Sequence, residues 1–211
     1  MHLGTIYNVA AKHGLRATFT PQMFMNSTGS LAHTNISIHS GHVKKNLQLS
    51  SVEKSFLAGV MAHHLPSLLA LTLPIPASYK WFSNGVWSGG TYMCWGTENR
   101  EAPVQLLNSA SPSSHQFEMH YVNGTVNTYL ALAGILGIGH LGIQSNLNLT
   151  ISDCPGPKMA AQMSEDECHT LGITKRMPLS WHEARNFQSS QDGVQGEMLI
   201  GKQGKVFYFC P

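Results

Sequence analysis

Charged side chains are scarce in this sequence. Aspartate, glutamate, lysine and arginine account for 11% of its 211 residues, less than half of the roughly 25% that globular proteins usually carry. The formal net charge is +2, and the scattered lysines and arginines form no basic run interleaved with aromatic residues. We therefore expect no nucleic-acid partner. We also expect another molecule to cover part of this weakly charged surface.

Closely spaced cysteine pairs are also absent. None of the four cysteines belongs to a Cys-x-x-Cys motif; they are Cys94, Cys154, Cys168 and Cys210. This spacing indicates neither a zinc ribbon nor a dithiol redox motif. It favours free thiols in a reducing compartment.

The sequence lacks a long hydrophobic run as well. The longest runs, Leu65–Leu73 and Tyr129–Ile143, are too short or too rich in glycine to span a bilayer. Residues 1–11 contain no basic segment followed by an apolar stretch, which a secretory signal requires. We expect a soluble, cytoplasmic protein with no membrane partner.

What is present is enough apolar material for a core. Hydrophobic residues make up 42% of the chain, which fits one large domain or a piece of a larger one. Residues 6–15 read as the last turns of a helix that stops at Gly14. Because the beginning of that helix is missing, we interpret the chain as trimmed or as a fragment.

Hydrophobic periodicity predicts an α+β fold, in which a curved antiparallel sheet is backed by two long helices. The expected strands are Arg16–Thr20, Ala32–Ile38, Tyr92–Trp95, Pro103–Leu107 and Gln116–Tyr121, and the expected long helices are Val52–Leu73 and Thr128–Gly142. Shorter helices are predicted after two serine N-caps, Ser164 and Ser180. Glycines beside aromatic residues predict a mobile loop in the region 78–92, and residues 196–209 are expected to form a small helix, a turn and a strand.

The chain is organised around residues 28–38, where a Thr-Gly-Ser turn leads into an alternating strand. His33, Asn35 and Ser37 point to one face of that strand, because side chains alternate with a period of two. An imidazole, an amide and a hydroxyl in a row suit a metal ligand followed by groups that bind a phosphorylated cofactor. The alternative is a polar strand face that simply meets solvent.

A second polar row lies on the strand Gln116–Tyr121, where Glu118 and His120 share a face. Groups at positions i and i+2 of a strand can reach the same ligand. The alternative is a pair of surface residues. In contrast, His63 and His64 are adjacent on a helix and point apart, so they do not form a metal pair.

Five blocks of the sequence, taken in order, resemble the C-terminal part of the catalytic domain of glutamine synthetase, the ATP-dependent glutamate–ammonia ligase. The sequence is most similar in character to the glutamine-synthetase-like proteins of fungi. The blocks are 13–21, 29–37, 78–80, 95–100, and Glu118 followed by 127–133; residues 172–180 are similar as well. The resemblance implies that residues 1–211 form part of that catalytic domain, without the N-terminal β-grasp domain and the first catalytic strands.

The resemblance also implies a role for several side chains. In this family ATP phosphorylates the γ-carboxylate of the substrate, ammonia displaces the phosphate, and two Mg²⁺ or Mn²⁺ ions assist. His33 and Glu118 match two of the three protein ligands of the ATP-side ion. The nucleotide-binding positions are Ser37, Asn35 and Arg100, and the substrate-binding positions are Thr28, Gly29 and His120. No residue is assigned a covalent or acid–base catalytic role.

Five positions depart from the family pattern. Arginines are replaced by Trp81, Gln105, Gln116 and His120, and the family's second histidine on the strand Ala32–Ile38 is replaced by Asn35. The flap glutamate has no acidic counterpart near residues 85–90, and the remaining metal ligands of the family lie upstream of the matched blocks. Three interpretations therefore stay open. The chain is a ligase that carries half an active site, a non-catalytic relative that binds or scaffolds, or a truncated product that does not fold independently.

The expected partners are ATP, a glutamate-like acid, and ammonia or an amine. The family forms ring-shaped homo-oligomers, which makes a homo-oligomer a candidate state for this chain. These expectations depend on one geometric prediction. The side chains of His33 and Glu118, far apart in the sequence, must lie side by side and face a common cavity.

Overall fold

A computed structural model describes residues 3–21, 23–24, 32–39, 49–61, 65–83 and 90–189. Two of the predicted substrate residues, Thr28 and Gly29, lie outside the described residues, as does the predicted tail structure at 196–209. The remaining predictions can be compared with the structure.

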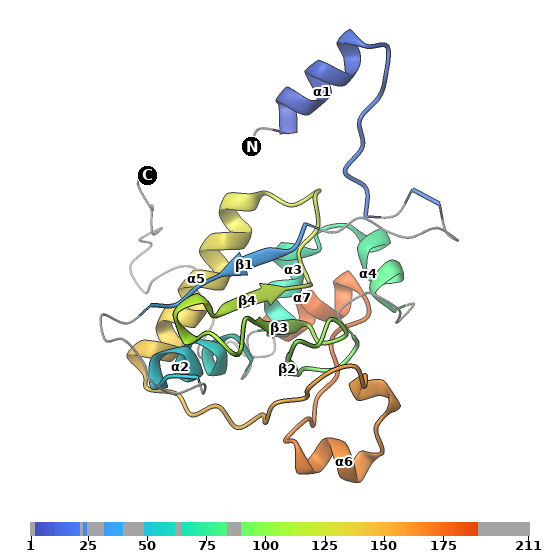
Figure 1. Cartoon of the computed structure of the whole chain (residues 1–211). Helices are drawn as coiled ribbons and strands as arrows, with labels where there is room; N and C mark the ends of the chain where they lie inside the picture. The colour runs from blue at the N-terminus through green and yellow to red at the C-terminus, as the bar shows by residue number, and fades with distance from the viewer. Residues whose placement is uncertain are drawn as a thin grey trace.

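The centre of the fold is a four-stranded sheet with the order β1-β4-β3-β2 (Figure 1). Its strands are β1 (Thr34–Ile36), β2 (Trp95–Thr97), β3 (Val104–Leu107) and β4 (Gln116–Met119). The β1–β4 and β3–β4 pairs are antiparallel, whereas β2 and β3 are parallel. The expected α+β class is confirmed.

The prediction of a wholly antiparallel sheet was wrong at β2. Residues 98–103 return the chain to the edge of the sheet at which β2 begins, so β3 starts beside Trp95 and runs in the same direction as β2. The reversal begins at Glu98, which adopts a positive φ of 50°. Its carboxylate accepts a hydrogen bond from the backbone N–H of Asn108 at 3.0 Å, which fastens the turn to the far end of β3.

Arg16–Thr20, predicted as a strand, has no regular structure. Thr18 Oγ1 accepts a hydrogen bond from the backbone N–H of Thr20 at 3.2 Å, and such local bonds compete with strand pairing. The expected strand Tyr92–Trp95 is also displaced. Regular pairing starts at Trp95, and Tyr92 forms only an isolated bridge with Arg176.

The expected long helix Val52–Leu73 is divided into α2 (Ser51–Gly59) and α3 (Leu65–Thr72). Proline at position 66 has no backbone N–H, so it suits the first turn of a new helix better than the middle of a long one. A further helix, α4 (Pro76–Ser83), occupies part of the region predicted as a loop. Proline at its first position is typical of a helix start, and the aromatic and glycine content of the region obscured that signal.

The other helices agree with the sequence patterns. They are α1 (Leu3–Lys12), α5 (Thr128–Gln144), α6 (Glu165–Thr170) and α7 (Trp181–Ser189), with single 3₁₀ turns at Pro112–Ser114 and Ala160–Gln162. Gly14, just after α1, has a φ of 68°, as expected of a helix stop. Within the described ranges, no helix combines the length and the apolar character needed to cross a membrane.

One face of the sheet packs on helices and the other is polar. Ile36, Phe117 and Met119 join the main hydrophobic core with residues of α2, α3 and α5. Figure 1 shows α3, α5 and α7 behind the sheet, while α1 stands apart and buries none of its residues. The side chains that alternate with these along β1 and β4, such as Asn35 and Glu118, therefore point away from the core and lie on the face that carries the candidate site.

Candidate metal centre

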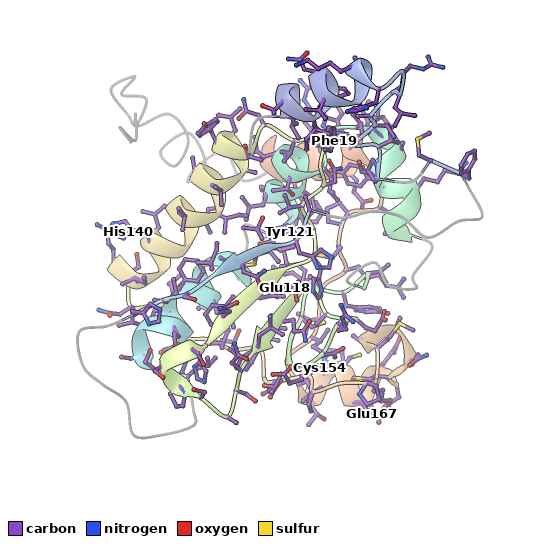
Figure 2. All side chains as sticks on the ribbon, turned by 45° about the horizontal axis from the view of Figure 1, so that its top comes forward. Phe19, Glu118, Tyr121, His140, Cys154 and Glu167 are labelled. Atoms are coloured by element: carbon purple, nitrogen blue, oxygen red, sulfur yellow. The ribbon has the colours of Figure 1, made fainter. Side chains whose placement is uncertain are left out.

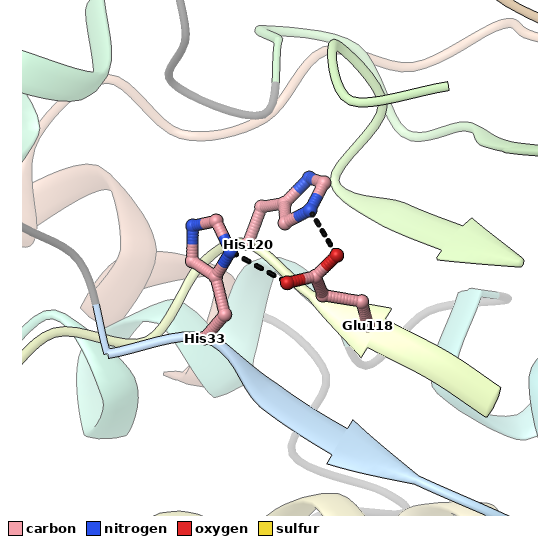
Figure 3. A group of neighbouring side chains, drawn as sticks. All are labelled: His33, Glu118 and His120. Atoms are coloured by element: carbon pink, nitrogen blue, oxygen red, sulfur yellow. Dashed lines mark hydrogen bonds and ion pairs between the residues drawn. The ribbon is translucent and has the colours of Figure 1, made fainter. Parts of the chain in front are cut away.

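Three polar side chains converge on the polar face of the sheet at the β1–β4 pair. His33 immediately precedes β1, Glu118 lies in β4, and His120 immediately follows β4. His33 Nδ1 lies 2.8 Å from Glu118 Oε1, although the residues are 85 positions apart (Figure 3). The predicted proximity of His33 and Glu118 is confirmed.

The register of the sheet explains this convergence. Asn35 is directly opposite Glu118 in the antiparallel pair, so His33 and His120 come next on the same face. Their ring centroids are 4.5 Å apart. His120 Nε2 approaches the second carboxylate oxygen of Glu118 at 3.4 Å. One carboxylate thus lies between two imidazoles, and we call His33, Glu118 and His120 the trio.

Burial increases from one side of the trio to the other. The side chains of His33, Glu118 and His120 are 28%, 16% and 2% exposed, respectively. Burial alone would raise the pKa of Glu118, but the hydrogen bond from His33 and the charges of both imidazoles outweigh it, so the pKa lies below its usual range. Burial, together with the charge of His33, lowers the pKa of His120. The two directions thus favour the ionised form of Glu118 and disfavour the charged form of His120.

The buried imidazole is held by a backbone contact. His120 Nδ1 lies 2.7 Å from the carbonyl oxygen of Ala102, which can only accept a hydrogen bond. Nδ1 must therefore carry the proton, and Nε2 of the neutral ring presents a lone pair. Among the described residues, Nε2 has no hydrogen-bond partner, and the 3.4 Å approach to Glu118 does not qualify as one.

The trio fits a divalent cation. One ligand atom from each side chain can be chosen so that all of them lie within 4.8 Å of one another. Two imidazole nitrogens and a carboxylate oxygen are ordinary ligands of divalent transition metals, and the unpartnered buried Nε2 faces the carboxylate. Holding the second nitrogen of a ligating imidazole by a backbone carbonyl is also typical of metal sites.

The other predicted residues are not part of this contact. Asn35 and Ser37 are exposed on or next to β1, on the same strand face as His33. Arg100 is exposed in the turn that follows β2. Their nucleotide-binding roles remain predictions.

Two glutamines stand beside the trio where the family pattern has arginines. Gln105 pairs with Glu118 across β3 and β4, is buried, and has no hydrogen-bond partner for its Oε1 within the described part of the chain. Gln116 lies two residues before Glu118 on β4 and is half-buried. The polar face thus carries neutral amides next to the candidate cation site.

Sequence reasoning did not assign His120 to the same ligand set as His33. The resemblance put it at a substrate position, whereas the structure brings it to the carboxylate of Glu118. Its i, i+2 spacing from Glu118 was the signal that pointed to a shared ligand.

Sequence spacing also concealed the proximity of Cys94 and Cys154, which lie with Cys168 in a second core cluster. A hydrogen bond with Cys154, together with burial, raises the pKa of the Cys94 thiol.

A cavity of about 270 Å³ lies elsewhere, lined by residues of 147–151 and 172–175 together with Met61 and Met93. Among the described residues that line it, none belongs to the trio and none carries a carboxylate or an imidazole. The candidate metal site is therefore the trio and not this cavity.

Comparison with known proteins gives the family. The family described as "Glutamine synthetase, catalytic domain" matches residues 4–203. Protein fluG of Emericella nidulans is 40% identical over 173 residues, covering 82% of this chain and 18% of that protein. The glutamine synthetase of Rhizobium leguminosarum is 32% identical over 204 residues, covering 90% of this chain and 44% of that enzyme.

Other relatives agree. The gamma-glutamylpolyamine synthetase GlnA3 of Streptomyces coelicolor is 33% identical over 206 residues, covering 92% of this chain and 42% of that enzyme. The solved structure of GmaS without ligand superimposes with a TM-score of 0.69 at 27% identity, over 95% of this chain and 45% of that one. The chain thus spans less than half the length of each of these relatives. It belongs to the glutamine synthetase family and corresponds to sequence within the catalytic domain of that family.

Proposed function

We propose that this chain carries the ATP-side metal site of a glutamine-synthetase-type ligase. Such a ligase joins ammonia or an amine to the γ-carboxylate of a glutamate-like acid through an acyl phosphate. The observation that supports this proposal is the 2.8 Å contact between His33 and Glu118 on the polar face of the sheet. These two residues match the metal ligands of the family and come from segments that meet only in the folded chain.

The chain's own residues have defined tasks in this proposal. Glu118 supplies a carboxylate that its two imidazole neighbours keep ionised, as its lowered pKa indicates. Asn35 and Ser37, exposed beyond His33 on the same strand face, offer an amide and a hydroxyl to a nucleotide. Arg100, exposed after β2, offers a charge to its phosphates. A bound Mg²⁺ or Mn²⁺ ion would neutralise phosphate charge during transfer.

The names of two relatives support the substrate class. One is a gamma-glutamylpolyamine synthetase, and a solved structure at 26% identity, with a TM-score of 0.69, is an ADP complex of GmaS. We therefore propose adenine nucleotide as one substrate and ammonia or an amine as another. His120, at a position where the family pattern has an arginine that binds the substrate carboxylate, favours an altered acid or amine over the standard pair.

Two neutral glutamines, Gln105 and Gln116, stand where the family pattern has arginines and support a second candidate, a non-catalytic relative that binds metal and nucleotide. Each arginine that pairs with phosphate oxygens contributes a few kcal/mol of transition-state stabilisation to a phosphoryl-transfer site, so replacing two of them by neutral amides would slow transfer by roughly a thousandfold or more. Metal ligands of the family that lie outside the matched blocks would have to come from other protein segments.

Calorimetric titration of the full chain with Mn²⁺ and a non-hydrolysable ATP analogue tests the proposal. We expect nucleotide binding that requires Mn²⁺ and that is lost in Glu118→Ala. Absence of metal-dependent nucleotide binding would rule out the ligase. Binding without ADP formation, in the presence of glutamate and either ammonia or a polyamine, would favour the non-catalytic relative.

A further inference from the structure

His120 has no partner on one side of its ring although it is almost completely buried. Its Nδ1–H donates to the Ala102 carbonyl at 2.7 Å, which fixes the tautomer and turns the lone pair of Nε2 toward Glu118. The closest carboxylate oxygen, 3.4 Å away, is also an acceptor. Two such acceptors repel unless a proton or a metal ion lies between them, and this contact does not have the geometry of a hydrogen bond that would share a proton.

Solvent cannot satisfy this nitrogen, because its exposed area is below 1 Å². A buried polar atom without a partner is costly, and a bound ion is one of the ways in which a protein satisfies such an atom. The Nδ1–carbonyl contact also prevents the ring from turning Nε2 elsewhere. The site is therefore built to present this lone pair to a cation beside Glu118.

His33 completes the geometry at the other oxygen of the carboxylate. Its Nδ1 lies 2.8 Å from the other oxygen of Glu118, and the two rings are 4.5 Å apart between centroids. Atoms that bind one ion tetrahedrally at about 2.1 Å lie about 3.4 Å from one another. The chosen ligand atoms of the trio, all within 4.8 Å, need only small rotations to reach such spacing.

We propose that His120 Nε2 is a third protein ligand of the ion bound by His33 and Glu118, and that this second imidazole gives the site a preference for Zn²⁺-like ions. This inference rests on the proposed metal site and goes beyond it by assigning a ligand and an ion preference. Imidazole nitrogen suits Zn²⁺, Co²⁺ and Ni²⁺, whereas Mg²⁺ and Mn²⁺ favour carboxylate and water oxygens. Two imidazoles therefore increase the ratio of Zn²⁺ to Mn²⁺ affinity.

The test compares Zn²⁺ and Mn²⁺ affinities of the full chain by competition with a chelator. His120→Asn is the informative variant, because its amide keeps a donor near the Ala102 carbonyl and removes Nε2. His140→Asn is the matched control, since His140 is exposed on α5, away from Glu118 (Figure 2). Glu118→Ala defines which part of the signal belongs to the trio, because the chain has 12 histidines.

We expect His120→Asn to weaken Zn²⁺ binding at least about tenfold. Loss of a residue that only hydrogen-bonds to a metal ligand already costs about that much affinity, and loss of a ligand should cost no less. The Zn²⁺/Mn²⁺ affinity ratio should fall with it, and His140→Asn should match the wild type. Unchanged affinity and ratio in His120→Asn would overturn the inference. If Glu118→Ala abolished binding in that case, the proposed metal site itself would stand.

A second measurement does not depend on how His120→Asn folds. Pulsed electron paramagnetic resonance of Cu²⁺ bound to the wild-type chain counts coordinated imidazoles through their remote nitrogens. After subtraction of the Glu118→Ala spectrum, two imidazoles support the inference and one overturns it. If the wild-type chain bound none of these ions at the trio, both the inference and the proposed function would fail.

Discussion

Two histidine–glutamate pairs of the described chain can be compared, because both join residues that are distant in the sequence. Glu53 of α2 meets His115, 62 positions away, at 3.2 Å, and Glu118 of β4 meets His33, 85 positions away, at 2.8 Å. The side chains of the first pair are each 1% exposed. Those of the second are 16% and 28% exposed.

The two pairs differ in whether each histidine nitrogen has a hydrogen-bond partner. In the first pair, His115 contacts Glu53 through Nδ1 and the Ser109 carbonyl through Nε2, while Glu53 also accepts hydrogen bonds from Ser50 at the start of α2. In the trio, the nitrogen of His120 that faces Glu118 has no partner in the described chain. We call the first pair closed, and we call the trio open because it leaves one buried nitrogen without a hydrogen-bond partner among the described residues.

Removal of the closed carboxylate should have the largest effect. We expect Glu53→Ala to lower the free energy of unfolding by about 3 kcal/mol, because it leaves Nδ1 of the buried His115 without a partner and also removes the capping box of α2. Urea denaturation measures this. The matched control is Glu167→Ala, which removes an equivalent but exposed capping box at α6 and should cost far less. Equal losses in the two variants would contradict the structural role of the buried pair.

Added metal should stabilise the folded chain through the trio and not through the Glu53–His115 pair. At a Zn²⁺ concentration about 100 times the dissociation constant, the wild-type chain should gain about 2.7 kcal/mol of stability. Glu118→Ala should gain nothing from the trio, whereas a version carrying a substitution at His115 should retain the full response. Melting curves with and without Zn²⁺ measure this. Equal stabilisation of wild type and Glu118→Ala would show that the metal binds elsewhere.

His115→Asn should have a smaller effect than loss of Glu53. An asparagine cannot reach both partners of the imidazole, so one buried hydrogen-bonding group is left unpaired, at a cost of about 1–3 kcal/mol. The midpoint and slope of urea unfolding give the value. A loss of Zn²⁺ affinity in the folded variant would break the separation between the two pairs.

The smallest effect concerns acid. The pKa of Glu118 is lowered in the folded chain, so between that value and the ordinary glutamate pKa of about 4.3 the unfolded chain binds more protons. The stability from Glu118 is fully present above the ordinary pKa and is lost as the pH falls through the lowered one. Metal-free wild type should therefore lose stability faster on acidification than Glu118→Gln. Parallel pH profiles of the urea midpoint would be inconsistent with this.

Part of the fold followed from local sequence signals. Gly14 after α1, Asn127 before α5 and Ser164 before α6 act through hydrogen bonds or backbone conformations within a few residues, so these boundaries could be predicted. Pro66 was the sequence signal for an interruption of Val52–Leu73, although the apolar periodicity continued across it. The direction of β2 was missed because a turn at Glu98 with positive φ has no strong sequence signature.

The candidate site was predictable in a similar measure. Alternation along residues 33–37 identified one polar row, and the i, i+2 spacing of Glu118 and His120 identified another. Neither pattern reveals which strands pair. Nor does either pattern show which ring nitrogen faces the carboxylate, because the Ala102 carbonyl that decides it comes from a different turn of the chain.

The sequence by itself determined which side chains share a strand face, where several helices begin and end, and membership of the glutamine synthetase family. These properties depend on side-chain period, on contacts between near neighbours and on ordered motifs, all of which are readable along one dimension. Only the tertiary structure decided that β1 lies against β4, that one carboxylate stands between two imidazoles, and that the histidine–glutamate pair at α2 is closed. Such contacts depend on the register of segments tens of residues apart, which is set by packing of the whole core.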